Sequence, residues 1–545
     1  MITPLRATGD GTLPTLLDRL ARDRARHPAL RWVPFDGPGA SWTYGELVRD
    51  VRRLAAGLQA RGIGPGDRLV LLMDNGPDLV LSWAAVLTAG AVAVCLNTRS
   101  SADELGYYGR HAAPEAAIVA PEYAGELAAA MPGLRWIAVA DGLPGGARPG
   151  PSGADSLRRL LADERDLRPP AVRPLDAASI QYTSGTTARP KAVVWTHANC
   201  LWAGQVGAAH QRLGPADVNL LHLPLFHTNA LSYSLLSTWW AGATTVLQPK
   251  FSASRFWQVA AAHGCTWSSM VSFCLRALAG HDVVAGHNFR GWGNSYCIAP
   301  GQGPGGVPAI GWFGMTETVS HPVCGDPCQP DLPGSMGRPA PEYAVAVVAE
   351  SGAESGAGSG AAVGPGEMGL LLVRGVPGVS LFGGYFGDAA ATAAAYTEDG
   401  WLRTGDRVRR DPGGTLTFVE RDKDVLKVGG ENVGAPEIER VVLQARGVRE
   451  AAVVGRPDRM LGEVPVAFVL LDGQRGDDDL GNGDLGNGGE AGVLREIEAL
   501  CARLLPAFKR PREVRVVAEL PRSTLDKVAK ARLRGLLRDG DPAGG

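Results

Sequence analysis

The sequence predicts an α/β protein with more than one domain. Its 545 residues exceed what a single hydrophobic core usually supports, so at least two domains are expected. Short apolar runs alternate with segments of helical periodicity through most of the chain, which is typical of a parallel sheet covered by helices. Residues 366–421 depart from this rhythm and have the pattern of short strands and turns, and the alternation then returns in a compact C-terminal piece.

The first α/β unit follows Thr43, where "SWTYGELVRDVRRLAAGLQARG" has a helical period and "DRLVLLM" has the composition of a buried strand. The next apolar run, from Leu79 to Leu96, reaches the lower length limit of a membrane helix. However, Pro77 and Asp78 are typical of a helix start, Gly90 of a helix end, and "AVAVCL" of a short buried strand. We therefore expect a helix and a strand here, with a membrane span as the alternative.

Later runs predict further strands of the same kind. In the first part of the chain these are "AAIVA", "WIAVA", "NLLHLPL" and "TTVLQ", with helical stretches between them. In residues 366–421 the expected strands lie in "GEMGLLLVRG", "WLRTGD" and "GGTLTFVERD". In the C-terminal piece, helix and strand alternate through "APEIERVVLQARGVREAAVVG", "VPVAFVLL", "VLREIEALCARLL" and "REVRVVAEL".

Composition excludes several functional classes. Lys+Arg 54 against Asp+Glu 56 gives a formal charge of -2, so neither nucleic acid nor an anionic membrane is an expected partner. The N-terminal segment carries charges throughout and lacks the apolar core of a signal peptide, which predicts a cytoplasmic protein. The eight cysteines are scattered, and only Cys324 and Cys328 are close together, without the spacing of a zinc site, so buried reduced thiols are expected.

Two segments of low complexity interrupt the pattern. Residues 350–366, "ESGAESGAGSGAAVGPG", have the composition of a flexible surface insertion. Residues 473–492 contain a tandem "DLGNG" and few groups that could pack, which predicts a disordered hairpin tip. A calcium loop is the alternative for the second segment, but the ligand spacing and terminal glutamate of an EF-hand are missing.

The segment "YTSGTTARPKAVVWTH", from Tyr182 to His197, combines small hydrogen-bond donors with cations. Its N–H groups and hydroxyls can face anionic oxygens while Arg189 or Lys191 supplies positive charge, so one interpretation is a polyphosphate loop. The other is a Ser/Thr/Gly turn between two strands. The spacing does not fit the P-loop, in which the lysine directly follows a glycine. By itself the segment leaves both interpretations open.

A set of motifs in a fixed order decides between them. The motifs are "YTSGTTARPK", "LPLFHTN", "GWFGMTET", "GSMGRP", "WLRTGD", "RDKDVLKVGGENVGAPEIE" and "LPRSTLDKVAK". Their order resembles the adenylate-forming superfamily of acyl- and aryl-CoA synthetases, peptide-synthetase adenylation domains and luciferases, from about Trp42 to Leu533. The resemblance implies a large N-terminal adenylation domain over residues 1–421, with parallel-rich sheets and a small β-barrel-like subdomain. It also implies a small, mobile α+β C-terminal domain over residues 424–545, attached by a hinge.

The resemblance implies a reaction in two steps. A carboxylate attacks the α-phosphorus of ATP to give an acyl-adenylate and pyrophosphate, and a thiol, expected to be coenzyme A, then displaces AMP. Because the carboxylate must approach a polyanion, catalysis is expected to rest on positioning and on neutralisation of charge by donors, lysines and Mg²⁺.

The family's nucleotide site can be carried over to these motifs. The phosphate loop is expected to hold the β- and γ-phosphates through Thr183, Ser184, Gly185, Thr186, Thr187 and Lys191. In "GWFGMTET", Glu317 is expected to hold Mg²⁺, Thr316 to bond the α-phosphate, and Phe313 to stack on adenine, unless Phe313 is an ordinary core aromatic. Asp406 is expected to accept both ribose hydroxyls, and Arg421 to contact the ribose or the phosphates.

The resemblance also assigns residues to the acid and to the change of conformation. Lys527 is expected to bridge the carboxylate, the α-phosphate and the ribose in the first step; Asp526 precedes it where the family usually has glycine, so Lys530 is the fallback. His227 is expected to gate the carboxylate end of the acyl tunnel, with a satisfied core histidine as the alternative. Lys423 matches the family's hinge.

Two further glycines match the family, and the sequence departs from the family at two places. Gly429 and Gly430, in "KVGGENV", are expected to line the pantetheine tunnel with bare backbone. Ala188 replaces the glycine usual in the phosphate loop. The segment 293–312 lacks the helix that the family normally places before the adenine motif, and this region forms one wall of the substrate pocket.

The sequence therefore predicts an ATP-dependent carboxylate ligase, an acyl- or aryl-CoA ligase that uses Mg²⁺. Aromatic-rich segments, "LSYSLLSTWW", "CTWSSMVSFCL" and "RGWGNSYC", favour an aromatic or medium hydrophobic acid, although such side chains are often core. One alternative is an enzyme that activates nitrite and transfers it to an aromatic amine, as in a diazotase. Another is a nucleotide-binding pseudoenzyme. The oligomeric state stays open, with a homodimer among the options.

Overall fold

The computed structural model describes residues 11–142, 155–183, 189–328, 331–349, 361–421, 425–471, 489–521, 528 and 530–539. The chain forms two compact units. The first comprises Met1–Thr98, Gly106–Tyr182 and Ala192–Glu420, and the second comprises Arg99–Leu105, Thr183–Lys191 and Arg421–Gly545. Residues 350–360 and 473–488 of the low-complexity segments lie outside the described residues, whereas residues 489–492, expected in the hairpin tip, begin a helix instead.

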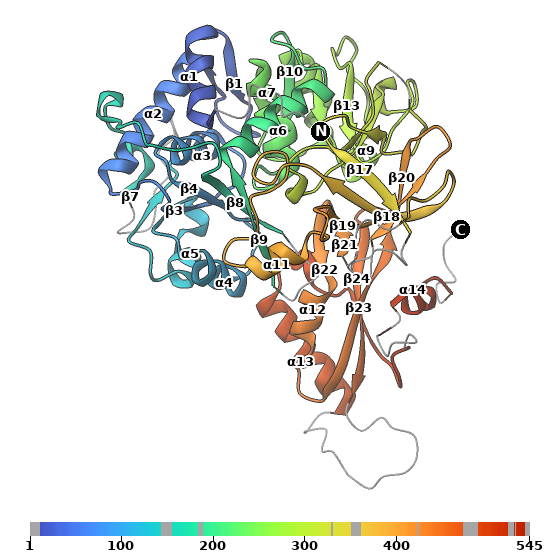
Figure 1. Cartoon of the computed structure of the whole chain (residues 1–545). Helices are drawn as coiled ribbons and strands as arrows, with labels where there is room; N and C mark the ends of the chain where they lie inside the picture. The colour runs from blue at the N-terminus through green and yellow to red at the C-terminus, as the bar shows by residue number, and fades with distance from the viewer. Residues whose placement is uncertain are drawn as a thin grey trace. The chain divides into compact units, whose positions relative to one another are not determined.

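One large sheet has seven described strands and is built from the predicted α/β units (Figure 1). In spatial order they are β7 (Asp155–Ser156), β6 (Trp136–Val139), β5 (Ala116–Val119), β3 (Arg68–Leu72), β4 (Val92–Cys95), β8 (Ala177–Thr183) and β9 (Lys191–Thr196). The pairs from β7 through to β8 are parallel. The predicted strands of this region are thereby confirmed, and parallel pairing follows from helical crossovers between them.

The helices of this region begin and end where the sequence signals place them. Helix α2 (Tyr44–Ala60) has Thr43 as its N-cap, and Thr43 and Glu46 form a capping box. Helix α3 (Pro77–Thr88) has proline at its first position, and the chain turns at Gly90 with a φ of 88° into β4. Among the described residues no helix is long and apolar enough to cross a membrane, so the alternative for Leu79 to Leu96 is wrong.

The remaining helices around this sheet are shorter. They are α1 (Leu13–Asp23), α4 (Ala102–Ala112), α5 (Ala124–Ala130) and the 3-10 turns Pro121–Tyr123, Leu157–Leu160 and Glu164–Asp166. Helix α1 packs on α2 and α3 and also on α6 (His197–His210), which follows β9. Its apolar stripe of buried leucines therefore joins one hydrophobic core that extends under both large sheets.

A second large sheet has nine described strands. In spatial order they are β16 (Arg338–Pro339), β15 (Val323–Cys324), β14 (Ala309–Phe313), β13 (Gly291–Asn294), β12 (Trp267–Ser269), β10 (Val218–Leu221), β11 (Thr244–Leu247), β1 (Pro28–Trp32) and β2 (Ala40–Thr43). The central strands from β14 to β1 are parallel, and β2, β15 and β16 pair antiparallel at the two edges. The carboxyl ends of β12, β13 and β14 consequently meet at one edge of the sheet.

Helical segments connect these strands, and one of them is unusual. The regular ones are α7 (Ser237–Ala241), α8 (Ala253–His263) and α9 (Ser272–Leu278). Residues Asn229–Leu236 form a π-helix, η4, which packs on α6 and α7. Such helices are rare and are frequent at functional sites. Between β13 and β14 the chain forms only the 3-10 turn Pro304–Gly306, so the helix expected to be absent from segment 293–312 is absent.

Two smaller sheets complete the fold. The predicted subdomain is a four-stranded sheet of β17 (Ala344–Val348), β18 (Met368–Arg374), β19 (Leu402–Arg410) and β20 (Leu416–Arg421), with α11 (Ala389–Ala394) between β18 and β19. The C-terminal sheet has the order β22 (Glu431–Gly434), β21 (Val425–Val428), β24 (Gly462–Leu471), β23 (Val448–Asp458), with β25 (Glu513–Val516) also on β24. Its helices are α12 (Ala435–Val442), α13 (Gly489–Leu504), α14 (Lys530–Asp539) and a 3-10 turn at Ala507–Lys509.

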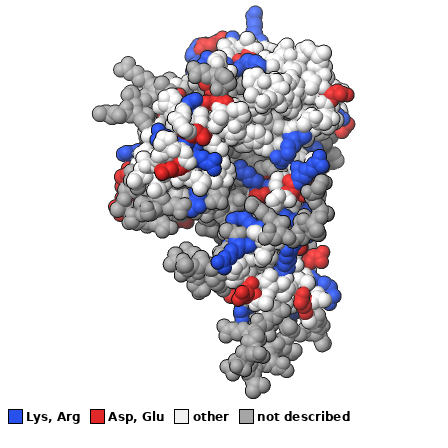
Figure 2. Space-filling model, turned by 90° about the vertical axis from the view of Figure 1, so that its right-hand side faces the viewer, with Lys and Arg blue, Asp and Glu red and all other residues white. Residues whose placement is uncertain are grey.

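The surface agrees with a protein of balanced charge, and most of the cysteines are buried. Figure 2 shows lysine and arginine interspersed with aspartate and glutamate over one face, in keeping with the formal charge of -2. Six cysteines are buried, as expected, but Cys324 is half-buried and Cys328 is exposed, so the expectation of buried thiols is wrong for these two. The described residues hold no cluster of metal-ligating side chains large enough to bind an ion alone.

Candidate active site

The candidate site lies where β14 ends and the motif "GWFGMTET" turns back. After Phe313 the chain forms a 3-10 turn, η6 (Thr316–Thr318), whose N-cap is Met315. The Thr318 hydroxyl donates to the Met315 carbonyl at 3.0 Å and accepts from the Met315 N–H at 2.9 Å. These two bonds fix the turn, and with it the positions of Thr316 and Glu317.

Glu317 is a buried carboxylate, 6% exposed, held by a tyrosine that sequence reasoning missed. The Tyr385 hydroxyl donates to Glu317 Oε1 at 2.8 Å, and the Phe382 N–H donates to the Glu317 carbonyl at 2.9 Å. Burial, and then the negative charge of Glu317, raises the pKa of Tyr385, so this hydroxyl keeps its proton as a donor. A single oriented carboxylate that shares Mg²⁺ with substrate phosphates is the usual form of a magnesium site, and Glu317 fits that role.

Removing the Tyr385 hydroxyl tests this arrangement. We expect Tyr385→Phe to lower the rate of acyl-adenylate formation by about 10- to 100-fold, because a hydrogen bond to a charged group is lost. The Mg²⁺ titration of the rate should shift to higher concentration. Tyr396→Phe is the matched control, because Tyr396 also packs on Phe382 but its hydroxyl has no hydrogen-bond partner among the described residues. Equal losses in both variants would contradict a specific role for Tyr385.

Thr316 links three segments that are distant in the sequence. The Trp195 indole N–H, on β9, donates to the Thr316 carbonyl at 2.9 Å. The Thr228 hydroxyl donates to Thr316 Oγ1 at 2.9 Å. Thr228 directly follows His227 in "LPLFHTN", so the structure brings the histidine motif and the "GMTET" motif together. His227 itself is partly exposed and stacks edge-on against Phe226, 4.6 Å between ring centroids, so it is not a fully buried core histidine.

The residue after this turn carries backbone strain. Val319 has φ 63° and ψ -44°, a conformation that a β-branched residue rarely adopts. Its side chain is fully buried, and the Ser232 hydroxyl, on η4, donates to its carbonyl at 2.6 Å. Strain of this kind persists where the surroundings fix the backbone, and it is common beside functional sites.

Phe313 and Asp406 lie on two elements that pack together. Phe313 is 7% exposed and belongs to a hydrophobic cluster with residues of the four-stranded sheet, among them Val408 of β19. Asp406 is fully buried on β19, two residues before Val408. The structure therefore places Asp406 on a strand that packs against Phe313 through Val408. Phe313 is part of the core, and its stacking on adenine stays a prediction.

Several other expected residues lie at segment ends or outside the described residues. Thr183 ends β8 and Lys191 begins β9, and both are partly exposed; the loop between them, Ser184, Gly185, Thr186, Thr187 and Ala188, lies outside the described residues. The same holds for Lys423, Asp526 and Lys527, and for the side chain of Arg421. Gly429 and Gly430 form the turn between β21 and β22, with φ of 59° and 91°.

The fallback lysine has another contact. Lys530 Nζ lies 2.6 Å from the Glu439 carboxylate of α12, and both side chains are mostly buried. This ion pair gives Lys530 a structural contact within the C-terminal unit, which favours Lys527 as the lysine that acts on the acid.

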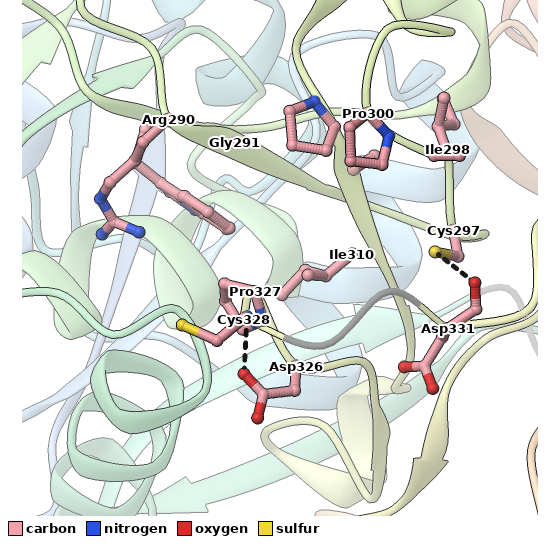
Figure 3. Close-up of a pocket in the computed structure, with 14 residues that line it drawn as sticks. Arg290, Gly291, Cys297, Ile298, Pro300, Ile310, Asp326, Pro327, Cys328 and Asp331 are labelled. Atoms are coloured by element: carbon pink, nitrogen blue, oxygen red, sulfur yellow. Dashed lines mark hydrogen bonds between the residues drawn. The ribbon is translucent and has the colours of Figure 1, made fainter.

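A cavity of about 180 Å³ lies elsewhere on the nine-stranded sheet (Figure 3). Its lining includes Trp267, Gly291 and Ala309, which are the first residues of β12, β13 and β14. The close-up also shows the Cys297 thiol donating to the Asp331 carbonyl beside it. Ligands of open α/β sheets bind outside the carboxyl ends of the strands, so this cavity lies at the wrong ends to be the candidate site.

Comparison with known proteins identifies the family. The family described as AMP-binding enzyme matches residues 17–386, and the AMP-binding enzyme C-terminal domain matches residues 437–527. The chain is an AMP-binding enzyme. This confirms the expected family and, with it, the expected activity: ATP-dependent ligation of an acid to coenzyme A through an adenylate.

The relatives of this AMP-binding enzyme include several CoA ligases. A sulfoacetate–CoA ligase from Cupriavidus necator is 30% identical over 95% of the chain and 97% of that protein. A crotonobetaine/carnitine–CoA ligase from Salmonella arizonae is 29% identical over 96% and 99%. Among solved structures, the o-succinylbenzoate CoA synthetase of Bacillus subtilis has a TM-score of 0.77 at 26% identity over 97% and 98%. ATP-bound MatB from Rhodopseudomonas palustris has a TM-score of 0.66 at 26% identity over 97% and 99%.

Proposed function

We propose that the enzyme activates a small carboxylic acid and that its reaction centre is the turn that carries Thr316 and Glu317. The observation that supports this is the convergence on Thr316 of the histidine motif, through Thr228, and of β9, through Trp195. The hydroxyl of Thr316 then bonds an α-phosphate oxygen, and His227 borders the entry of the carboxylate.

The acid attacks the α-phosphorus while this chain's residues hold the two reactants and balance the charge. Glu317 holds Mg²⁺, which supplies positive charge to the phosphates. Asp406 accepts the ribose hydroxyls, and the loop from Thr183 to Lys191, with Lys191, holds the β- and γ-phosphates. Lys527 brings a cation to the carboxylate and the α-phosphate as the bond to pyrophosphate breaks.

The second step passes the acyl group to coenzyme A. The thiol sulfur attacks the acyl carbon of the adenylate, the mixed anhydride bond breaks, and AMP leaves. We place the backbone of Gly429 and Gly430 along the pantetheine arm, and Lys423 at the point about which the C-terminal domain rotates between the steps. The relatives named for sulfoacetate and carnitine act on small polar acids, which supports a small acid for this enzyme too.

The test is pyrophosphate release across a panel of acids, followed by mass spectrometry of the CoA product. The proposal expects at least one small carboxylate to give both pyrophosphate and a CoA thioester. Pyrophosphate release with nitrite and no carboxylate would replace it with the diazotase alternative, for which the relatives give no support. ATP binding without pyrophosphate release from any acid would favour a pseudoenzyme.

A further inference from the structure

A wall of aromatic side chains lies beside the reaction centre. Gly314 precedes Thr316 by two residues, and a Cβ atom placed on it would lie 2.2 Å from the Tyr233 hydroxyl. The Tyr233 ring lies 5.6 Å from Trp312 and 4.0 Å from His321, centroid to centroid. The Trp312 indole stacks on the His321 ring at 4.4 Å and 18°. All three rings are at most 5% exposed, so they leave little room behind Gly314.

Gly293, a glycine of the sheet, makes room for the Trp312 ring of this wall. A Cβ atom placed on Gly293 would lie only 1.7 Å from the Trp312 ring, so the indole lies directly across the β13 backbone. Gly293 pairs with Ser269 of β12 and Ile310 of β14, and Ile310 shares its face of the sheet with Trp312. The indole thus fills the face of the sheet on which Ser269 lies. Burial, and then the charge of His210, lowers the pKa of His321 well below its usual range, so the ring stacked on Trp312 is neutral.

Polar groups lie next to this aromatic wall. The Ser269 hydroxyl donates to Asn229 Oδ1, which turns the Asn229 amide nitrogen and its two hydrogens away from Ser269. Neither this nitrogen nor the Tyr233 hydroxyl has a hydrogen-bond partner among the described residues. Asn229 directly follows Thr228, whose hydroxyl bonds Thr316. Two donors therefore lie next to the reaction centre, on the side closed by Trp312.

From this geometry, and resting on the proposed function, we infer the class of acid: a short carboxylic acid whose far end carries an oxygen acceptor, such as a hydroxyl or a second acidic group. That oxygen receives hydrogen bonds from the Asn229 amide and the Tyr233 hydroxyl. Trp312 excludes aromatic and long-chain acids. Of the aromatic residues that favoured an aromatic acid, Trp239, Trp267 and Trp292 are at most 1% exposed and belong to the core.

Pairs of acids in which a hydroxyl group replaces a methyl group test the polar contacts. We expect kcat/KM for CoA thioester formation to be about 10- to 100-fold higher for glycolate than for propionate, and for 3-hydroxypropionate than for butyrate. Tyr233→Phe removes only the hydroxyl, so it should reduce this ratio mainly by lowering kcat/KM for the hydroxy acids. Equal use of both members of each pair by the unsubstituted enzyme would overturn the inference.

A matched pair of tryptophan variants tests the size limit. The unsubstituted enzyme should give no measurable thioester with benzoate or octanoate. Trp312→Leu should raise the rate of thioester formation with one of these acids at least about tenfold, because room for one or two more methylene groups in a pocket changes kcat/KM by this much. Trp292→Leu is the control, because Trp292 lies on the opposite face of the sheet against Phe289 and Trp257. Efficient use of benzoate or octanoate by the unsubstituted enzyme would overturn the inference while leaving the ligase function intact. Failure with every acid would count against the proposed function itself.

If Trp312→Leu does not fold, the unsubstituted enzyme and Tyr233→Phe still decide the matter. The acid pairs and the two large acids are measured on the enzyme as it is, and the tyrosine variant keeps the ring that packs on Trp312 and His321.

Discussion

Glu317→Gln is expected to lower the rate of acyl-adenylate formation by about 10² to 10³-fold, the scale for losing one preorganised charge interaction at a transition state. Glutamine preserves the shape of the side chain and can still accept from the Tyr385 hydroxyl, which lies 2.8 Å from Glu317 Oε1. What it removes is the negative charge that attracts the cation. The loss should therefore appear in turnover and in a higher Mg²⁺ requirement, with little change in melting temperature.

The measurement is pyrophosphate release at a series of Mg²⁺ concentrations with saturating acid. Glu398→Gln is the matched control, because Glu398 is exposed on the same unit and the substitution is the same. A Glu317→Gln enzyme whose Mg²⁺ titration coincides with that of the unsubstituted enzyme would show that Glu317 does not hold the metal.

Lys527→Ala is expected to separate the two half-reactions. Adenylate formation from acid and ATP should fall by about 10² to 10³-fold, because the lysine neutralises charge only while the carboxylate attacks phosphorus. Formation of thioester from a supplied acyl-adenylate and coenzyme A should stay within about threefold of the unsubstituted enzyme, since the second step attacks carbon and has no need of that cation.

Lys530→Ala is the companion variant, since Lys530 is the other lysine of this motif and pairs with Glu439. It should lose stability rather than either half-reaction. If the two variants exchanged these phenotypes, Lys530 would be the adenylation lysine. If Lys527→Ala reduced both half-reactions equally, its assigned role would be wrong.

The α/β elements were predicted well from the sequence, because the ends of helices and strands depend on neighbouring residues. The capping box at Thr43, the proline at the start of α3 and the turn at Gly90 each fix a boundary through contacts a few residues apart. Motif order brought Thr316 and Glu317 together for a related reason, since both lie on a single short turn, and their roles stay a prediction.

The supporting residues could not be predicted, because their contacts join distant parts of the chain. Tyr385 is 68 residues from Glu317, and Thr228 is 88 residues from Thr316. The π-helix is another example, since "NALSYSLL" has no pattern that distinguishes it from an α-helix. The aromatic segments could not identify the acid, because a ring in a core and a ring that lines a pocket have the same composition signal.

The bond from Ser232 to the carbonyl of strained Val319 has a consequence for how such an enzyme can evolve. Ser232 belongs to the same π-helix as Asn229 and Tyr233, which are proposed to contact the acid, while Val319 directly follows the turn that is proposed to carry the reacting groups. A substitution that shifts the π-helix to admit a new acid therefore also disturbs the turn, so selectivity gained there costs turnover. Trp312 and Gly293 lie on the sheet, and among the described residues no hydrogen bond joins the Trp312 indole to the turn. Substitutions that admit new substrates should therefore arise first on the strands. Substitutions in the π-helix should follow only after compensating substitutions have accumulated.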